Sequence, residues 1–403
     1  MKAETVKVLC RYYASFASGG LGRIFCFSAM GRREHETMDH LGAAIGWICR
    51  AQDASGDGGV ARSYSLVYNP CFRRKGWMAS YPETTGYIIP TMFDYARLSG
   101  EAKKEIFGRA VRMADWECEV QMSCGAVQGG TVDQKRPATP AIFNTGQVIF
   151  GWLAAYRETG GVKYLRSAEK AGVYLAGQQD ADGAWRKNLS DYASSGMDSY
   201  TYNARTAWAL LLLHNETGEG LFRDAALKNL EFALTRQLEN GWFESNCLDD
   251  PANPLLHTIA YAVRGFLESG LLADRPDFVE RAKRAADALI LAQRSDGGLA
   301  GRFNRRWGPA ANWSCLAGDA QMALIWGRLF QVTAEEKYLR AMLAMNRYLK
   351  RAQLLHAGSA DIHGGMGGSD PLGGAYGRFE VLSWAVKFFI DALMLEIRVV
   401  QDA

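Results

Sequence analysis

Two kinds of helical pattern alternate along the chain. One is amphipathic and rich in charged residues, as in "GGVKYLRSAEKAGVYLAGQQ" from Gly160 and "RPDFVERAKRAADALILAQ" from Arg275. The other is apolar on most sides, and it covers residues 87–95, 146–156, 204–213, 260–267, 317–330 and 382–395. An amphipathic helix belongs at a surface, whereas a helix that is apolar all round belongs inside. The pattern therefore predicts outer helices that alternate with six inner ones.

A glycine-rich turn follows each amphipathic pattern and marks a repeat. Examples are "GQQDADGAW" from Gly177, "RQLENGWF" from Arg236 and "AQRSDGGLAG" from Ala292. Successive copies lie 56 to 69 residues apart, counted between the glutamines Gln52, Gln121, Gln178, Gln237, Gln293 and Gln353. Glycine permits the positive φ of a tight turn, and the polar side chains satisfy backbone groups at helix ends. Self-similarity of this period indicates a repeat architecture.

Six outer and six inner helices predict an (α/α)6 toroid, an all-α fold in which the last inner helix lies beside the first. An open helical solenoid is the alternative, but its ends would need polar caps. The C-terminal "FEVLSWAVKFFIDALMLEIRVV" is instead as apolar as any inner pattern. No alternating strand pattern recurs, so little sheet is expected. We predict one toroid domain over residues 36–403, preceded by an N-terminal extension over residues 1–35.

Composition and charge narrow the class of protein. Hydrophobic residues make up 48% of the chain and charged residues 22%, as in ordinary globular proteins. A net charge of +3 gives no field that would attract nucleic acid, so no such partner is expected. Eight scattered cysteines without a CxxC pair, together with the lack of a signal-peptide pattern, predict a cytoplasmic protein. The extension is basic without acidic residues over residues 5–33, so it would contact a membrane surface or a partner protein, or pack outside the domain.

The repeated turn resembles that of several toroidal families. "QQDADGAW", "QLENGWF" and "AQRSDGGL" are similar to the turns of terpene cyclases, protein prenyltransferase β-subunits and toroidal carbohydrate-active enzymes. The resemblance covers about residues 36–395, and it implies the fold rather than a reaction. A protonating cyclase needs a DxDD acid, but "DADG" at residues 180–183 belongs to the turn. Cys247 and His257 lack the paired acidic context of prenyltransferase zinc ligands, so neither a metal nor a cofactor is expected.

A second resemblance concerns "SYPETTGYIIPTMFDYA", residues 80–96. This stretch is similar to the one that opens an inner helix in the unsaturated glucuronyl and rhamnogalacturonyl hydrolases. The closing "YGRFEVLSWAVKFFIDALM", residues 376–394, has the same character. No motif here places the catalytic aspartate of those hydrolases. The resemblance therefore implies a substrate class, uronate-containing glycans, more than a reaction.

Polar residues at the starts of the inner helices predict a site. All inner helices of an alternating toroid run the same way, so their N-terminal ends meet around one central cavity, and their dipoles favour an anionic ligand. The predicted catalytic residues are Glu83, Tyr87, Asp198, Tyr200, His257 and Asp319. The predicted substrate-binding residues are Trp77, Tyr81, Asn144, Tyr202, Asn203, Arg205, Arg305, Trp313, Tyr376, Arg378 and Glu380. Aromatic rings stack on sugar rings and planar polar groups bind vicinal hydroxyls, so this combination indicates a glycan substrate.

Two reactions remain open for such a site. Removal of the C5 proton of a uronate uses a tyrosine or histidine base in toroidal lyases and glucuronyl C5-epimerases, and the tyrosines, His257 and arginines favour this reaction. Glycoside hydrolysis by two carboxylates is the alternative. A cyclase-like or prenyltransferase-like toroid and a non-catalytic glycan-binding protein are the others. Each acidic residue also has a structural interpretation, because Asp and Glu stabilise helix starts.

Overall fold

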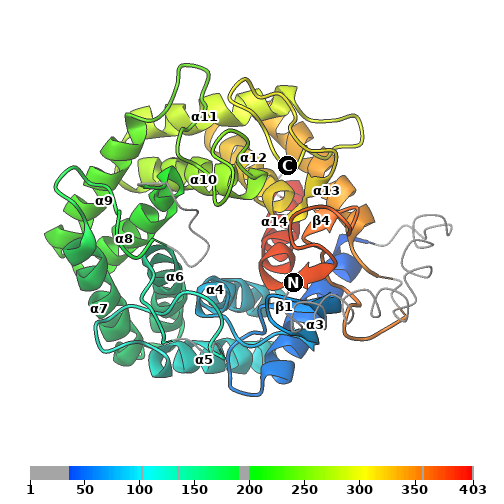
Figure 1. Cartoon of the computed structure of the whole chain (residues 1–403), viewed down its shortest axis with the longest axis horizontal. Coiled ribbons are helices and arrows are strands. Elements are labelled where there is room, and N and C mark those ends of the chain that lie inside the picture. Colours follow the sequence, from blue (N-terminus) through cyan, green and yellow to red (C-terminus); the bar gives the residue numbers. More distant parts are fainter. Residues whose placement is uncertain (1–35, 101–102, 134–136, 190–198, 356–357, 402–403) are drawn as a thin grey trace, which may run out of the picture.

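Two concentric rings of helices make up the part of the chain that the structure describes (Figure 1). The structure is a computed structural model, and it describes residues 36–100, 103–133, 137–189, 199–355 and 358–401. The inner ring contains α4 (Pro82–Leu98), α6 (Ile142–Thr159), α8 (Ala204–Thr217), α10 (Leu256–Leu272), α12 (Leu316–Thr333) and α14 (Ser383–Gln401). The outer ring contains α3 (Thr37–Ser55), α5 (Lys103–Glu119), α7 (Val162–Gln178), α9 (Gly220–Leu234), α11 (Pro276–Leu291) and α13 (Glu336–Ala352). The predicted (α/α)6 toroid is confirmed, and the predicted extension over residues 1–35 lies outside the described residues.

Burial separates the two rings as the sequence pattern predicts. The inner helix α12 buries residues on every side over its first three turns. The outer helix α13 buries one stripe that includes Tyr338, Met342, Met345 and Leu349. Residues three and four apart share one face of a helix. The outer helix therefore presents a single apolar face to the inner ring.

One glutamine side chain ties each repeated turn to the next outer helix. The amide nitrogen of Gln237 donates to the Gly241 carbonyl of its own turn at 3.1 Å and to the Arg281 carbonyl of α11 at 2.9 Å. The same pair of bonds is made by Gln52, Gln121, Gln179, Gln293 and Gln353. The third copy thus uses Gln179, which corrects the predicted Gln178, the last residue of α7. The repeat builds contacts between outer helices, not the site.

Glycine is required in these turns because the next outer helix lies very close. Gly183 has a φ of 90°, and a Cβ there would lie 2.2 Å from the carbonyl oxygen of Lys228 in α9. Gly364 has a φ of 81°, and a Cβ there would lie 2.0 Å from the carbonyl oxygen of Ala43 in α3. Side chains disfavour positive φ, and no heavy atom fits at these distances unless a helix moves.

The last repeat closes the ring onto the first outer helix. The amide nitrogen of Gln353, which follows α13, donates to the His40 carbonyl of α3 at 2.9 Å. Nδ1 of His40 lies 2.6 Å from the amide oxygen of the same glutamine. The inner helix α14 packs against α3, α4 and α12. Segments from opposite ends of the sequence therefore complete both rings.

Ion pairs join neighbouring inner helices near their C-terminal ends. Arg97 of α4 pairs with Glu158 of α6, and Arg157 of α6 pairs with Glu216 of α8. A basic side chain in the last turn also complements the negative end of the helix dipole. These pairs lie at the end of the toroid opposite to the predicted site.

Short strands stand where the inner helices begin. β1 (Ser63–Asn69) pairs antiparallel with β2 (Arg74–Trp77) and with β5 (Glu380–Leu382). β3 (Ser314–Cys315) pairs with β4 (Ser369–Asp370). The expectation of little sheet is confirmed for the described residues. The larger sheet joins the loop after α3 to the start of α14 and so forms one wall of the central region.

The described residues contain no helix with the length and apolar character needed to cross a membrane. None of their six cysteines forms a disulfide with another. Cys71 and Cys124 are exposed, so the thiols are not all buried.

Candidate functional site

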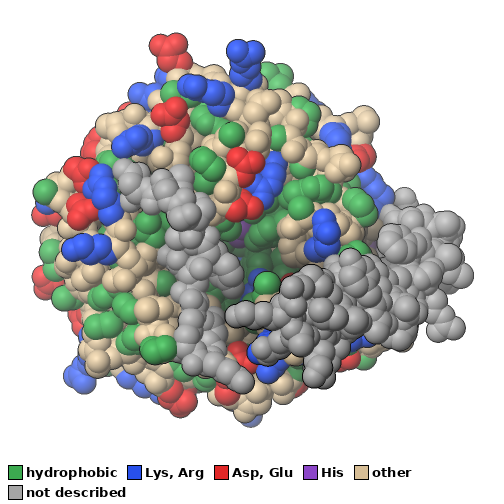
Figure 2. All heavy atoms as spheres, in the orientation of Figure 1, with side chains coloured by type: hydrophobic (Ala, Val, Ile, Leu, Met, Phe, Trp, Pro, Cys, Tyr) green, Lys and Arg blue, Asp and Glu red, His purple; other side chains and the backbone are tan. Residues whose placement is uncertain are grey.

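A cavity of about 290 Å³ lies at the end of the toroid where the inner helices begin. Figure 2 shows a hollow near the middle of this face, with charged side chains at its edge. The predicted site residues that line the cavity are Tyr81, Glu83, Tyr202, His257 and Tyr376. Other lining residues include Arg62, Phe143, Asp249, Tyr261, Arg302 and Trp384. The prediction that inner-helix starts surround a central cavity agrees with this lining.

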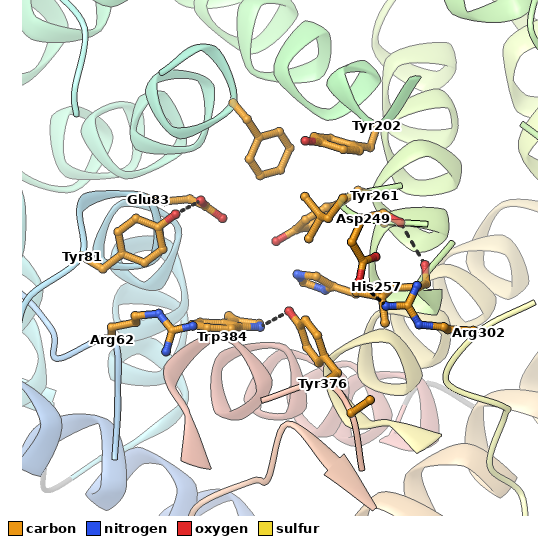
Figure 3. Close-up of a pocket in the computed structure, with 15 residues that line it drawn as sticks. Arg62, Tyr81, Glu83, Tyr202, Asp249, His257, Tyr261, Arg302, Tyr376 and Trp384 are labelled. Carbon is orange, nitrogen blue, oxygen red and sulfur yellow. Dashed lines mark hydrogen bonds and ion pairs between the residues drawn. The ribbon is translucent and has the colours of Figure 1, made fainter. Parts of the chain in front are cut away.

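Glu83 lies in the first turn of α4 and turns its carboxyl group into the cavity (Figure 3). Pro82 begins this helix, where its fixed φ suits the first turn. The Tyr81 hydroxyl donates a hydrogen bond of 2.6 Å to Glu83 Oε2. The Asn144 amide of α6 donates one of 3.1 Å to the Tyr81 oxygen. Tyr81, itself fixed by Asn144, thus holds the carboxyl group from one side while the cavity lies on the other.

Burial changes the proton affinity of Glu83. Loss of water raises its pKa from 4.5 to about 7, although the hydrogen bond from Tyr81 and the charges of Arg205 and Arg62 lower it. A carboxyl group with this pKa is present in both protonation states near neutral pH. It is therefore suited to give up or accept a proton during a reaction.

His257, in the first turn of α10, carries a neutral ring. The amide nitrogen of Gln321 lies 2.7 Å from His257 Nδ1, and it also donates to the Ala317 carbonyl at 3.1 Å. Because an amide nitrogen only donates, Nδ1 accepts and the ring proton lies on Nε2. Burial, with a smaller contribution from Arg205, lowers the pKa of His257 to about 3. The ring is therefore a hydrogen-bond donor toward a ligand rather than a base.

Aromatic rings form the walls of the cavity. Tyr202 stacks on Tyr200 with ring centroids 4.8 Å apart, and Phe143 meets Tyr202 edge to face at 5.0 Å. On another side, the indole of Trp384 donates to the Tyr376 hydroxyl at 2.9 Å. These walls offer flat apolar faces together with fixed polar groups, as ligand cavities commonly do.

The phenols of the cavity stay protonated. Burial raises the pKa of Tyr202, Tyr261 and Tyr376 above the ordinary value of 10. The pKa of the deeper Tyr87 is raised for the same reason. A tyrosine that removes a proton from a substrate needs a lowered pKa. These phenols are therefore suited to donate hydrogen bonds.

Arg62 reaches the cavity from the segment before β1. Its guanidinium pairs with Glu380 of β5 at 2.6 Å, and it lies 4.8 Å from the Phe72 ring and 4.9 Å from the Trp384 ring. Glu380 also accepts a hydrogen bond of 2.7 Å from the Ser63 hydroxyl. Glu380, predicted to bind substrate, therefore positions Arg62, and it is Arg62 that lines the cavity.

An ion pair lies across the cavity from Glu83 (Figure 3). Arg302 Nη2 is 2.6 Å from Asp249 Oδ2, and the Asp249 side chain is 60% exposed. Arg302 also donates to the Asn253 carbonyl at 2.8 Å, which fixes its position. Glu83 and Asp249 are the two carboxylates among the described residues that line the cavity.

Four predicted residues lie beneath or behind the lining. Tyr87 and Arg205 are buried below the cavity, where the Arg205 Nε donates to the Gln147 amide oxygen at 2.7 Å. Tyr200 supports Tyr202, and Asn144 supports the tyrosine that binds Glu83. These positions correct the expectation that all four face the cavity, because the narrow centre of the toroid leaves room for only one layer of lining.

Asp319 has a structural position. Its carboxyl group is fully buried and accepts a hydrogen bond of 3.2 Å from the backbone N–H of Leu299. Thr85 and Thr145 accept the same bond in their own repeats, from the residue two places after the turn glycine. Burial raises the pKa of Asp319 well above its usual range. This corrects the expectation that Asp319 lies at the cavity: it takes the place of a threonine hydroxyl in the scaffold.

The other predicted residues that the structure describes are not among those that line the cavity, namely Trp77, Asn203, Arg305, Trp313 and Arg378. Trp77 packs against Trp47 of α3 at 5.2 Å, because β2 is the strand of the small sheet farthest from β5. Arg305 and Arg378 are exposed in loops. These placements correct the expectation for all five. Asp198 lies outside the described residues.

The lining residues that were not predicted include Arg62, Asp249, Arg302 and Trp384. The first three lie in loops, where no helical period indicates which side chain points inward. The basic run "GRFNRRWG" contains Arg302, but nothing in the run distinguishes it from Arg305. Trp384 stands in the first turn of α14, and its place at a helix start was the signal that could have found it.

The described residues offer no obvious metal site. They include no group of three or more His, Cys, Asp and Glu side chains arranged to hold an ion. Burial raises the pKa of the Cys247 thiol to about 11.

Comparison with solved structures finds the same toroidal fold in several carbohydrate-active enzymes. An unsaturated glucuronyl hydrolase described as specific for heparin superposes with a TM-score of 0.69 at 17% identity, over 91% of this chain and 98% of that chain. The unsaturated glucuronyl hydrolase of Bacillus sp. GL1, described as responsible for the degradation of glycosaminoglycan, gives 0.67 at 13% identity, over 89% and 96%. A novel alpha-amylase from Clostridium perfringens gives 0.65 at 13%, over 91% and 99%. Likeness at these identities shows the fold.

Comparison by sequence finds no match. No protein-family model fits the chain, and no curated protein is similar to it. The function is therefore argued from the site.

Proposed function

We propose that the protein is a glycoside hydrolase that removes a terminal uronate from a glycan, with Glu83 as the proton donor. The observation that carries this proposal is the carboxyl group of Glu83, which faces the cavity and has a pKa of about 7. A proton donor must be protonated at the working pH and must lie within reach of the reacting atom. The proteins similar in fold include hydrolases named for unsaturated glucuronyl groups.

The polar lining supports a sugar ligand. Arg62, Glu83, Asp249, His257 and Arg302 converge on one cavity. A cavity for an isoprenoid would be almost wholly apolar, so this lining disfavours a cyclase-like or prenyltransferase-like protein. Arginine is the side chain best suited to a carboxylate, and two arginines lie here beside aromatic walls. The lining thus fits an anionic sugar.

Two variants of hydrolysis fit the two carboxylates. With an ordinary glycoside, Glu83 protonates the leaving oxygen, and Asp249 activates water or stabilises the oxocarbenium ion. With an unsaturated uronate, the proton adds to a carbon of the enol ether and water then attacks the resulting cation. The second variant needs one carboxyl group, because the Glu83 carboxylate formed in the first step can accept the proton of the attacking water.

Removal of the C5 proton is the second candidate. Glu83 supports it, because the ionised form present near neutral pH is a base in the cavity. The tyrosines and His257 support it less, since the raised pKa values of the phenols keep them protonated and the lowered pKa of His257 makes its imidazole a weak base. Hydrolysis therefore takes precedence over the lyase or epimerase reaction that the sequence favoured.

One assay separates these reactions. The protein is incubated in deuterated water with saturated and unsaturated uronate oligosaccharides. Hydrolysis of an unsaturated uronate removes its ultraviolet absorbance, and hydrolysis of a saturated one releases reducing ends without any change in absorbance. Elimination creates the absorbance, and epimerisation introduces deuterium at C5 without cleavage. We expect one of the first two results, and either of the others would overturn the proposal.

Two substitutions test the roles of the carboxylates. Glu83→Gln should lower kcat/KM by about 10²–10⁴-fold, the usual contribution of a general acid. Asp249→Asn should lower kcat/KM only for saturated substrates. Glu119→Gln, at an exposed position on α5, is the control and should retain full activity. Retention of wild-type turnover by Glu83→Gln would rule out Glu83 as the donor.

A further inference from the structure

Two pairs of side chains on inner helices lead from the cavity lining toward the buried Arg205. On α4, Glu83 stands four residues before Tyr87, and on α10, His257 stands four residues before Tyr261. Residues four apart lie on the same helix face, one turn from each other. The His257 and Tyr261 ring centroids are accordingly 4.4 Å apart. Each of these polar groups of the cavity therefore has a tyrosine one turn further along its helix.

Arg205 of α8 lies beside both tyrosines. Its guanidinium carbon is 6.0 Å from the Tyr87 centroid and 5.2 Å from the Tyr261 centroid. Three more rings lie within 5.5 Å, those of Phe150, Trp208 and Phe388. The five rings come from five different inner helices. The guanidinium therefore lies near the axis of the toroid, below the cavity.

No carboxylate neutralises Arg205 within the described part of the chain. The side chain has an exposed fraction of 4%, and its hydrogen bond to Gln147 is to a neutral amide. The neighbouring buried cation differs, because Lys387 pairs with Asp391. Aromatic faces offset part of the cost of a buried charge, but they do not cancel its field. In a buried site that field is screened little by water or salt.

We propose that Arg205 is a positioning residue whose buried charge lowers the proton affinity of Glu83 without touching a ligand. The ionisable groups that face Glu83 are Tyr81 and Tyr87 of α4, Arg62 before β1, Tyr202 before α8, Arg205 of α8, and Tyr261 of α10. Two of these are cations, and Arg62 already pairs with Glu380. Arg205 is therefore the unneutralised positive charge among them.

The direction of the effect follows from the charges. A positive charge favours the ionised carboxylate and disfavours a second positive charge on imidazole. The field of Arg205 accordingly lowers the pKa of both Glu83 and His257. Without it, burial would hold the proton on Glu83 more tightly, and the residue would release that proton less readily. The link to catalysis rests on the proposed function, but the electrostatic link does not.

The test measures the titration of Glu83 directly. The protein is labelled at the glutamate carboxyl carbons, the Glu83 resonance is assigned with Glu83→Gln, and its midpoint is followed by NMR as pH changes. Arg205→Met removes the charge and leaves a flexible side chain that suits an aromatic cage. Its Glu83 midpoint should rise by about one pH unit. Arg205→Lys keeps the charge and should titrate like the wild type.

Arg264→Met is the matched control. Arg264 also lies over the Trp208 ring, at 5.5 Å, and its partner Glu268 keeps a second contact to Arg328. This variant should leave the Glu83 midpoint unchanged. An unchanged midpoint in Arg205→Met, or an equal shift in Arg205→Lys, would show that Arg205 is only structural. If Arg205→Met does not fold, Arg205→Gln provides the same comparison.

An activity measurement separates this inference from the proposed function. With a hydrolysable substrate, the loss of kcat/KM at high pH should move upward in Arg205→Met by the same amount as the Glu83 midpoint. A moved midpoint in a protein that hydrolyses no uronate glycan would uphold the role of Arg205 and refute the proposed function. Hydrolysis of a uronate glycan together with an unmoved Glu83 midpoint would uphold the proposed function and refute the role of Arg205.

Discussion

Opposing influences act on the single side chain of Glu83. The start of a helix, the Tyr81 hydroxyl and the charges of Arg205 and Arg62 favour its carboxylate form. Burial favours the neutral form and outweighs them, which leaves the pKa at about 7. Glu83 is therefore neither fully ionised nor fully protonated near neutral pH.

This balance predicts the pH dependence of hydrolysis. Because the protonated form of Glu83 is the donor, kcat/KM should fall as pH rises through about 7 and then decrease about tenfold per pH unit. Tyr81→Phe removes a bond to the carboxylate, so its decline should begin at a higher pH. Initial rates between pH 5 and 9, about two units either side of neutrality, check both statements. If the decline in kcat/KM began at a lower pH in Tyr81→Phe than in the wild type, the result would contradict them.

Asp319 should tolerate replacement by the residue of the other repeats. Asp319→Thr should fold and hydrolyse normally, because Thr85 and Thr145 accept the same backbone hydrogen bond. Asp319→Leu should cost about 1–3 kcal/mol, since it leaves the Leu299 N–H without an acceptor. Denaturant unfolding and the hydrolysis assay measure the two effects. Loss of activity in a stably folded Asp319→Thr would restore a catalytic role to the residue.

Glu117 should make the fold sensitive to alkali. It is fully buried in α5, neither of its carboxyl oxygens is hydrogen-bonded to a described residue, and burial, then the charge of Asp57, raises its pKa well above 4.5. The unfolded chain loses this proton at lower pH than the folded chain, so the group reduces stability as pH rises above 4.5. Glu117→Met should therefore gain in melting temperature over the wild type, and gain more at pH 8 than at pH 5, about three units apart. Glu119→Gln is the exposed control, and an equal gain at both values would refute the linkage.

At the scale of elements, glycine is harder to replace in the turns than in the helices. Gly364 and Gly42 lie near each other in the structure but differ in surroundings. A Cβ at Gly364 would meet the Ala43 carbonyl, whereas a Cβ at Gly42, within α3, would meet no atom within 4 Å. Gly364→Ala should thus cost at least about 2 kcal/mol. Gly42→Ala should stabilise the protein by about 0.5–1 kcal/mol, the usual gain within a helix. Thermal unfolding of the two variants checks the contrast, and changes of the same sign would contradict it.

The elements also explain what sequence alone could predict. The apolar and amphipathic helices and the glycine turns repeat, so their number and order predicted the toroid. The repeat also placed Glu83 and His257, because both lie in the first turn of an inner helix. Arg62 and Asp249 come from loops of different length, and their direction depends on contacts with Glu380 and Arg302 far along the chain. Contacts between residues so far apart in the sequence cannot be predicted from a local sequence pattern.

Across the whole molecule, the cavity has a filled axis beneath it. The buried Tyr87 and Arg205 occupy the space that a through-running glycan would need. Hydrolysis should therefore proceed from a chain end and release single uronate residues from the first turnover. Chromatography of early products checks this, and a substrate with a blocked terminal residue is the control. Internal fragments among those products would contradict the filled axis.

The closure of the ring has a consequence for biosynthesis. Of the described helices, α3 leaves the ribosome first, but its bond to Gln353 and its packing on α14 require segments made more than 300 residues later, as the separation of 313 between His40 and Gln353 shows. The ion pair between Arg62 and Glu380 likewise cannot form until Glu380 has been synthesised. The nascent chain thus carries apolar inner helices without their final neighbours for most of its synthesis. Such a chain is exposed to aggregation until its last helix emerges, which makes it a candidate for chaperone binding during translation.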